Sequence, residues 1–176
     1  GKTTTTSMLS HILLKGECDP TISVGGILPA IGGNIRVGQS ETFLTEACEY
    51  TNSFLSFFPT LGIILNMDAD HLDFFKDIDD IRHSFRKFAE LLPADGALII
   101  NADTPKYEMV AENLPCKVIT YGLEHDAEYT ASDITYDEFG HPTFHVLHNG
   151  EDIGTCSLKV PGIHNVSNAL ASIAAG

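Results

Sequence analysis

Short apolar runs alternate with segments of helical periodicity through the middle of the chain. The runs Gly62-Ile63-Ile64-Leu65 and Ala97-Leu98-Ile99-Ile100 are continuously apolar, which is typical of strands buried on both faces of a parallel sheet. Between them Ile81, Phe85 and Phe88 recur at spacings of four and three, the period of a helix with one apolar face. This βαβ order predicts an α/β protein with a mostly parallel sheet flanked by helices.

The same patterns place the individual elements. We expect strands at Thr21–Val24, Thr42–Thr45, Leu61–Leu65, Ala97–Ile100 and Lys117–Thr120, and helices at Ile78–Leu92 and Pro105–Asn113. From Glu128 onward we expect strands at Tyr129–Tyr136, Thr143–His148 and Ile153–Val160, and a closing helix at Val166–Ala175. Asn149-Gly150 is a hairpin signal, so residues 128–160 are expected to form a small antiparallel sheet appended to the main one. The glycine-rich stretch Gly25–Gly38 is expected to be a long loop.

Composition and charge restrict the partners and the compartment. The chain has 176 residues, with 10 Lys and Arg against 24 Asp and Glu, which gives a formal net charge of −14. This length suits one domain, and so acidic a surface argues against nucleic acid or an anionic membrane as the main partner. No apolar run approaches the roughly 18 residues that span a bilayer, and no charged and apolar leader opens the chain, so we expect a cytoplasmic protein.

The first residues carry a phosphate-binding signal. Gly1-Lys2-Thr3 matches the second half of the loop G-x-x-x-x-G-K-[ST], and Met8, Leu9 and Ile12 follow with helical spacing. A helix that begins here directs its backbone N–H groups and its dipole at a phosphate, with Lys2 on the outer phosphates and the Thr3 hydroxyl on Mg²⁺. The first half of that loop, and the strand before it, are expected to precede Gly1. The alternative is a threonine-rich helix N-cap without a ligand.

Acidic and polar side chains follow two of the expected strands. They are Glu46 and Glu49 after the first, and Asn66, Asp68, Asp70, His71 and Asp73 after the second. Because ligands bind beyond the carboxyl ends of the strands in doubly wound sheets, we expect these side chains on one rim with the phosphate loop. Oxygen ligands without thiolates suit Mg²⁺ bound to a polyphosphate. The alternative for residues 68–73 is a solvated acidic loop that caps the next helix.

Two further groups of polar residues stand in the second half of the chain. Asn165 and Asn168 are three positions apart at a helix start, so both amides can face one ligand, and an amide suits the edge of an adenine ring. The alternative is that Asn165 alone caps the helix. His141, His145 and His148 lie in the appended sheet without a carboxylate pattern nearby, and we expect them to be solvent-exposed. No G-x-S-x-G elbow or histidine-activated cysteine is visible, so covalent catalysis is not expected.

Four segments, in this order, resemble the Mur ligase family. They are Gly1-Lys2-Thr3-Thr4-Thr5-Thr6, Glu46-Ala47-Cys48-Glu49, Asp68-Ala69-Asp70-His71-Leu72-Asp73 and His164-Asn165-Val166-Ser167-Asn168-Ala169. Each segment is weak alone, but the ordered set is specific and covers essentially the whole chain. The resemblance implies that residues 1–176 are one central ATP-binding domain. An N-terminal domain for the UDP moiety and a C-terminal domain would then lie outside this chain.

The resemblance also implies roles for individual residues. ATP would be bound by Gly1, Lys2, Thr3, Thr4, Asn165 and Asn168; Mg²⁺ by Thr3, Glu46 and His71; and the substrate by Glu49 and His71. Lys2 and His71 would be the catalytic residues. The family phosphorylates a substrate carboxylate with ATP, and an amine then attacks the acyl phosphate to give an amide.

The same resemblance indicates a branch of the family and leaves other activities open as alternatives. With Gly25-Gly26-Ile27 upstream, the chain resembles the branch that joins L-alanine to UDP-N-acetylmuramate in peptidoglycan synthesis. Several relatives carry a carbamylated lysine where Phe88 stands here, and this branch is similar in lacking it. Muropeptide-recycling and folyl-polyglutamate ligases stay open as alternatives, because the missing C-terminal domain largely selects the amine. A generic phosphate-loop NTPase or kinase would use Glu46 but gives His71 no role. A fragment that only folds is the last alternative.

Overall fold

Strands and helices alternate through residues 61–121, whereas strands predominate in residues 21–45 and 129–157. The computed structural model describes residues 1–69 and 73–176. The strands are β1 (Thr21–Leu28), β2 (Gly33–Arg36), β3 (Phe43–Thr45), β4 (Leu61–Ile64), β5 (Ala97–Asn101), β6 (Lys117–Tyr121), β7 (Tyr129–Tyr136), β8 (Pro142–His148) and β9 (Glu151–Ser157). The helices are α1 (Lys2–Lys15), α2 (Ile78–Glu90), α3 (Glu108–Ala111) and α4 (Ile163–Ala175), with 3₁₀ segments η1 (Pro29–Ile31) and η2 (Tyr50–Ser56). No helix in this described part is both long and apolar enough to cross a membrane.

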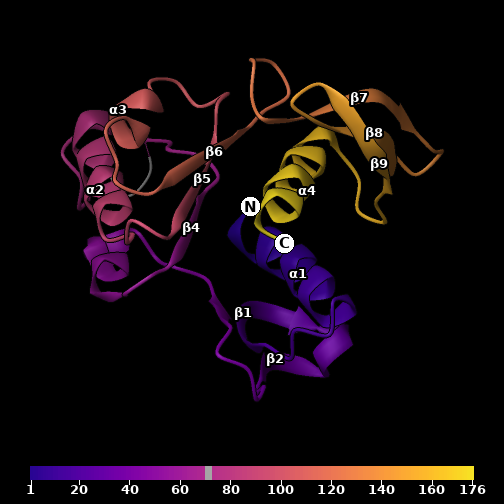
Figure 1. The fold of residues 1–176 in the computed structure, drawn as a ribbon, viewed down its shortest axis with the longest axis horizontal. Coiled ribbons are helices and arrows are strands. Elements are labelled where there is room, and N and C mark those ends of the chain that lie inside the picture. The colour runs from indigo at the N-terminus through magenta and orange to yellow at the C-terminus, as the bar shows by residue number, and fades with distance from the viewer. Residues whose placement is uncertain (70–72) are drawn as a thin grey trace.

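The described strands form two sheets (Figure 1). The larger sheet has the order β4-β5-β6-β7-β8-β9, with parallel pairing from β4 to β7 and antiparallel pairing from β7 to β9. The smaller sheet has the order β2-β1-β3, in which β1 is antiparallel to β2 and parallel to β3. The predicted α/β class with a mostly parallel sheet is therefore confirmed. The antiparallel strands continue the larger sheet through a single parallel pair, Tyr121 with Tyr129.

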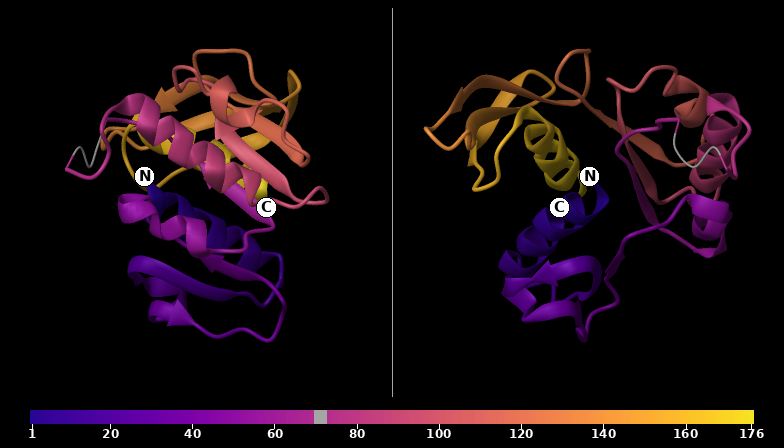
Figure 2. Two further views of the ribbon diagram at one scale, coloured as in Figure 1. Left: turned by 90° about the vertical axis from the view of Figure 1, so that its left-hand side faces the viewer. Right: turned by 180° about the vertical axis from the view of Figure 1, so that it is seen from behind.

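Helices cover both faces of the larger sheet around its central strand β5. Leu98 and Ile100 pack with Phe88 and Leu92 toward α2, whereas Ile99 packs toward α4. Figures 1 and 2 show α2 and α3 on one side of β4–β6 and α4 on the other. Because successive side chains of a strand point to opposite faces, burial on both sides requires the continuous apolar run seen in the sequence.

Three predicted segments differ from the structure. Helix α3 spans only Glu108–Ala111, because Lys106 and Asn113 adopt left-handed φ angles of 59° and 55° on either side of it. The stretch predicted as a loop over Gly25–Gly38 contains the end of β1, η1 and β2. Strand β9 begins at Glu151, because the dipeptide Asn149-Gly150, with both φ angles positive, closes a two-residue hairpin directly.

The prediction that no carboxylate lies near the three histidines of the appended sheet is wrong, and their side chains are only partly exposed. Each ring is half-buried and contacts a carboxylate: His141 with Asp137 at 3.1 Å, His145 with Asp152 at 2.7 Å and His148 with Glu128 at 3.0 Å. The sequence pattern misses these pairs because strand pairing and turns bring the partners together.

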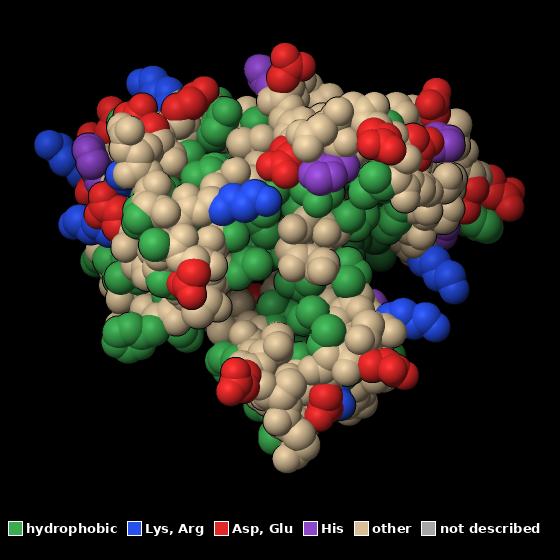
Figure 3. All heavy atoms as spheres, viewed as in Figure 1, with side chains coloured by type: hydrophobic (Ala, Val, Ile, Leu, Met, Phe, Trp, Pro, Cys, Tyr) green, Lys and Arg blue, Asp and Glu red, His purple; other side chains and the backbone are tan. Residues whose placement is uncertain are grey.

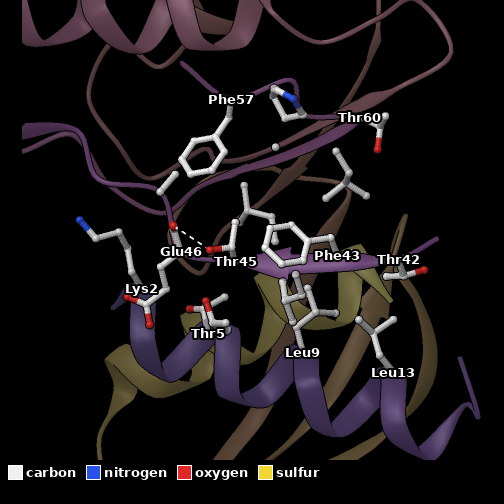
Figure 4. Close-up of a pocket in the computed structure, with 18 of the residues that line it drawn as sticks. Lys2, Thr5, Leu9, Leu13, Thr42, Phe43, Thr45, Glu46, Phe57 and Thr60 are labelled. Atoms are coloured by element: carbon white, nitrogen blue, oxygen red, sulfur yellow. Dashed lines mark hydrogen bonds between the residues drawn. The ribbon is translucent and has the colours of Figure 1, made fainter. Parts of the chain in front are cut away.

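A groove separates the two sheets along their edge strands β3 and β4. Its volume is about 690 Å³, and α1 forms its floor through Leu9 and Leu13, beneath Phe43 of β3 (Figure 4). Phe43 and Leu61 of the two edge strands are 60 % and 42 % exposed. On the face seen in Figure 3, hydrophobic side chains gather around the hollow between the sheets. Edge strands present unpaired backbone N–H and C=O groups, so two such rows border an apolar groove here.

The carboxylate of Asp103 holds the connection between β6 and β7 against the end of β5. It accepts hydrogen bonds from the backbone N–H groups of Leu123, Glu124 and His125 at 2.6, 3.1 and 2.9 Å. The His125 ring nitrogen lies 3.0 Å away. Burial by itself raises the pKa of Asp103, but these backbone and ring hydrogen bonds outweigh it and hold the pKa below its usual value.

We predict that Asp103→Asn lowers the free energy of unfolding at pH 7 by roughly 1–3 kcal/mol, because the charged acceptor of several N–H groups is lost. The pKa of Asp103 is lower in the folded than in the unfolded chain, so its contribution is present above pH about 4 and is lost as the pH falls below that. Urea unfolding between pH 7 and 3 measures this. The matched control is Asp126→Asn, an exposed position in the same connection. Equal losses in both variants, or a loss that does not change with pH, would contradict the prediction.

Candidate functional site

Helix α1 begins where the phosphate-binding motif predicts. Its first residue is Lys2, its N-cap is Gly1, and no side chain caps it. The alternative of a threonine N-cap is wrong, since Thr3 and Thr4 lie within the first turn. The first turn also contains no acidic residue. The N–H groups at this end therefore have no side-chain partner along the helix, as an anion site requires.

Glu46 lies directly after β3 and ties that strand to α1 and β1. Its Oε2 accepts a hydrogen bond from the Thr3 hydroxyl at 3.2 Å, and its Oε1 accepts one from the Gly25 backbone N–H at 2.7 Å. Parallel pairing of β1 with β3 brings Gly25 and Glu46 to the same end of the smaller sheet. A Cβ atom on Gly25 would stand 3.0 Å from the Glu46 carboxylate, so a larger residue there would make that side chain shift by a few tenths of an ångström. The sequence shows the glycine pair, but nothing in it indicates this contact.

Lys2 and Glu49 form an ion pair at the same place. The Lys2 Nζ lies 2.5 Å from Glu49 Oε2, and the two side chains are 47 % and 20 % exposed. Figure 4 shows Lys2 at the start of α1, beside Glu46. From the sequence we expect Lys2 to bind phosphates and Glu49 to contact the substrate. The structure joins these two residues to each other.

The oxygen atoms of Thr3 and Glu46 fit a Mg²⁺ ion that also takes phosphate and water ligands. Mg²⁺ prefers hard oxygen ligands and is usually bound through one or two protein groups together with a substrate phosphate. Within residues 1–69 and 73–176, no cluster of three or more His, Cys, Asp or Glu side chains could hold a metal by itself. His71, the predicted third ligand, lies with Asp70 outside the described residues.

The described residues that flank this segment contact η2 and one another. Asn66 and Asp68 are hydrogen-bonded to each other, and Asp73 accepts a hydrogen bond from the Tyr50 hydroxyl at 2.8 Å. This bond, together with the charge of Asp73, raises the pKa of Tyr50 above its usual value. Tyr50 follows Glu49 directly, so the segment after β3 reaches the segment after β4. Sequence reasoning missed Tyr50, because its type and spacing carry no signal of this contact.

The two asparagines of α4 face each other. The Asn168 amide donates to Asn165 Oδ1 at 3.1 Å, and the Asn165 amide donates to the Pro161 carbonyl at 2.8 Å. Both are buried, and the N-cap of α4 is Gly162, so the alternative of an Asn165 cap is wrong. Ser172 of the same helix donates to the Thr5 carbonyl of α1 at 3.1 Å. At 1.5 Å per residue, Asn165 stands about 10 Å along α4 from this contact.

Comparison with known proteins places the whole chain in one family. The sequence profile of the Mur ligase middle domain matches residues 1–176. The chain is 62 % identical to the UDP-N-acetylmuramate–L-alanine ligase of Lachnospira eligens, over 99 % of this chain and 38 % of that protein. It thus spans less than half the length of this relative.

Solved structures agree with this relationship. The UDP-N-acetylmuramate–alanine ligase of Thermotoga maritima is similar at 30 % identity with a TM-score of 0.83, over 99 % of this chain and 38 % of that one. The UDP-N-acetylmuramate:L-alanyl-γ-D-glutamyl-meso-diaminopimelate ligase of Neisseria meningitides is similar at 28 % identity with a TM-score of 0.86, over 99 % and 57 %.

We predict that Gly25→Ala displaces the Glu46 carboxylate and weakens the binding of ADP with Mg²⁺ about tenfold, the usual effect of disturbing a group that orients a metal ligand. Titration calorimetry on the full-length protein measures the affinity. Gly33→Ala is the matched control, because a Cβ there meets open space. Equal affinities of the two variants would show that Gly25 does not constrain Glu46.

Proposed function

The chain belongs to the Mur ligase family, as its middle domain, and from this premise we propose that it binds ATP and Mg²⁺ in an enzyme that joins L-alanine to UDP-N-acetylmuramate. Mur ligases are ATP-dependent ligases that form amide bonds. The observation that carries the proposal is the pair of contacts at the start of α1, Thr3 with Glu46 and Lys2 with Glu49. The 62 % identity to a UDP-N-acetylmuramate–L-alanine ligase supports this branch.

Each residue of the site has a stated task in this proposal. The backbone N–H groups of the first turn and the Lys2 ammonium bind the ATP phosphates, and Asn165 with Asn168 binds adenine. Thr3, Glu46 and His71 hold Mg²⁺, which when bound neutralises charge on the transferred phosphoryl group. Glu49 and His71 contact the substrate.

The chemistry requires cations because both reactants are anionic. A carboxylate oxygen of the sugar acid attacks the γ-phosphorus of ATP, and the bond to the ADP oxygen breaks. The amine nitrogen of L-alanine then attacks the acyl carbon; the bond to phosphate breaks, phosphate leaves, and the amine loses a proton. Lys2 acts in the first step, where its charge offsets the repulsion between carboxylate and triphosphate. Partner domains on either side would supply the UDP site and the amino-acid site, and exclude water from the acyl phosphate.

We also propose that the groove between β3 and β4 holds the strand that precedes Gly1 in the complete chain. The carboxyl ends of both edge strands reach the start of α1, because Glu46 contacts Thr3, and a Cβ on Gly1 would lie 3.4 Å from Leu65. A phosphate-binding loop connects a strand to the helix that follows it. Such a strand must end beside Gly1, which places it in the groove between the two edges and joins the sheets.

This arrangement makes a prediction for backbone amides. Along each edge strand, every second residue pairs its backbone groups with the neighbouring strand of its own sheet. The residues between them direct their backbone N–H groups into the groove. These are Phe43, Thr45, Leu61 and Ile63. In the full-length protein we expect these amides to exchange with deuterium as slowly as those of the controls Leu44 and Gly62. Slow exchange at the controls with fast exchange at the groove amides would show that the groove is open.

Turnover is expected to need all reactants together. We predict phosphate release by the full-length protein only when ATP, Mg²⁺, UDP-N-acetylmuramate and L-alanine are all present, and not when the tripeptide L-alanyl-γ-D-glutamyl-meso-diaminopimelate replaces L-alanine. Lys2→Ala should lower turnover by at least about 100-fold, the usual cost of removing one group that stabilises transition-state charge. Lys15→Ala, at the other end of α1, is the control. Phosphate release without an amino acid would overturn the proposal.

A further inference from the structure

Lys2 is the single Lys or Arg side chain in the segments around the start of α1. No other Lys or Arg stands in residues 1–14, and none stands in residues 37–75. These stretches contain the first turns of α1, β3, the segment after β3 and β4. These segments therefore offer a bound polyphosphate one ammonium group, and in the structure that group contacts Glu49 at 2.5 Å.

The formal charges leave this site negative. Lys2 contributes one positive charge and the N-terminus of α1 about half a charge, whereas Glu46 and Glu49 contribute two negative charges. A nucleotide without metal adds further negative charge and must compete with Glu49 for the ammonium. A nucleotide complexed with Mg²⁺ carries less negative charge and brings a cation to Glu46 and Thr3.

The two carboxylates have different partners. Glu46 accepts hydrogen bonds from the Gly25 backbone and from Thr3, so strand pairing fixes its position. Glu49 contacts Lys2, whose side chain is 47 % exposed, whereas that of Glu49 is 20 % exposed. A phosphate that arrives from solvent can therefore reach the ammonium and compete with Glu49 for it.

We propose that Glu49 is a positioning residue that holds Lys2 while the site is empty and yields it to the nucleotide phosphate. Its charge makes the site favour metal-complexed over metal-free nucleotide. This inference rests on the proposed function, because it takes the nucleotide phosphate to lie at Lys2. It assigns Glu49 a role toward the nucleotide in addition to the contact with the substrate proposed above.

The test is the affinity of the full-length protein for ADP, with EDTA and separately with Mg²⁺. Glu49→Gln keeps the shape and removes the charge, so metal-free ADP should bind roughly five- to twentyfold more tightly, while ADP with Mg²⁺ changes by less than about threefold. The gain should shrink as salt is added. Glu49→Asp keeps the charge and should remain near the wild type. Glu41→Gln removes the same charge before β3 and is the control for net charge.

The outcomes separate the inference from the proposed function. If the wild type binds no ADP even with Mg²⁺, the proposed function fails. If it binds ADP with Mg²⁺ but Glu49→Gln gains no more affinity for metal-free ADP than Glu41→Gln does, the inference alone fails. If Glu49→Gln changes only the KM for UDP-N-acetylmuramate, Glu49 acts on the substrate alone, and the inference is overturned.

Discussion

The carboxylate of Glu46 connects three elements on which the arrangement of the site depends. One oxygen accepts the Thr3 hydroxyl of α1, and the other accepts the Gly25 N–H at the end of β1, while Glu46 itself continues β3. Parallel pairing brings the carboxyl ends of β1 and β3 together, and α1, which precedes β1, begins at that end, so these groups meet. The same end of α1 approaches Leu65 after β4, so both sheets contribute to one rim.

An acidic chain offers few cations to an anionic ligand. The net charge is −14, and one lysine faces the phosphate position of the motif. The carboxylates beside this lysine suit a metal ion better than they suit a phosphate. The contact of Glu49 with Lys2 follows from this shortage of positive charge, because an exposed ammonium among carboxylates pairs with the nearest one.

The side chains of β5 are buried on both faces of the larger sheet, and this packing holds the helices on its two sides. Ile99 packs toward α4 and Leu98 toward α2, so both helix layers are anchored on one strand. Helix α4 also contacts α1 through Ser172 and the Thr5 carbonyl, which relates the asparagine pair to the start of α1. Phe88 is part of this packed layer, against Gly62.

The sequence by itself determined the fold class, most strand positions, the start of α1 and the place of Lys2 and Thr3 in its first turn. Each of these depends on neighbours in the chain: apolar periodicity, turn dipeptides and a glycine-lysine-threonine motif. Only the tertiary structure decided that Gly25 holds Glu46, 21 positions away, and that Glu49 contacts Lys2, 47 positions away. It also decided that Asn165 and Asn168 bond to each other and that the peripheral histidines meet carboxylates. Such contacts depend on strand register and helix packing, which a local pattern does not encode.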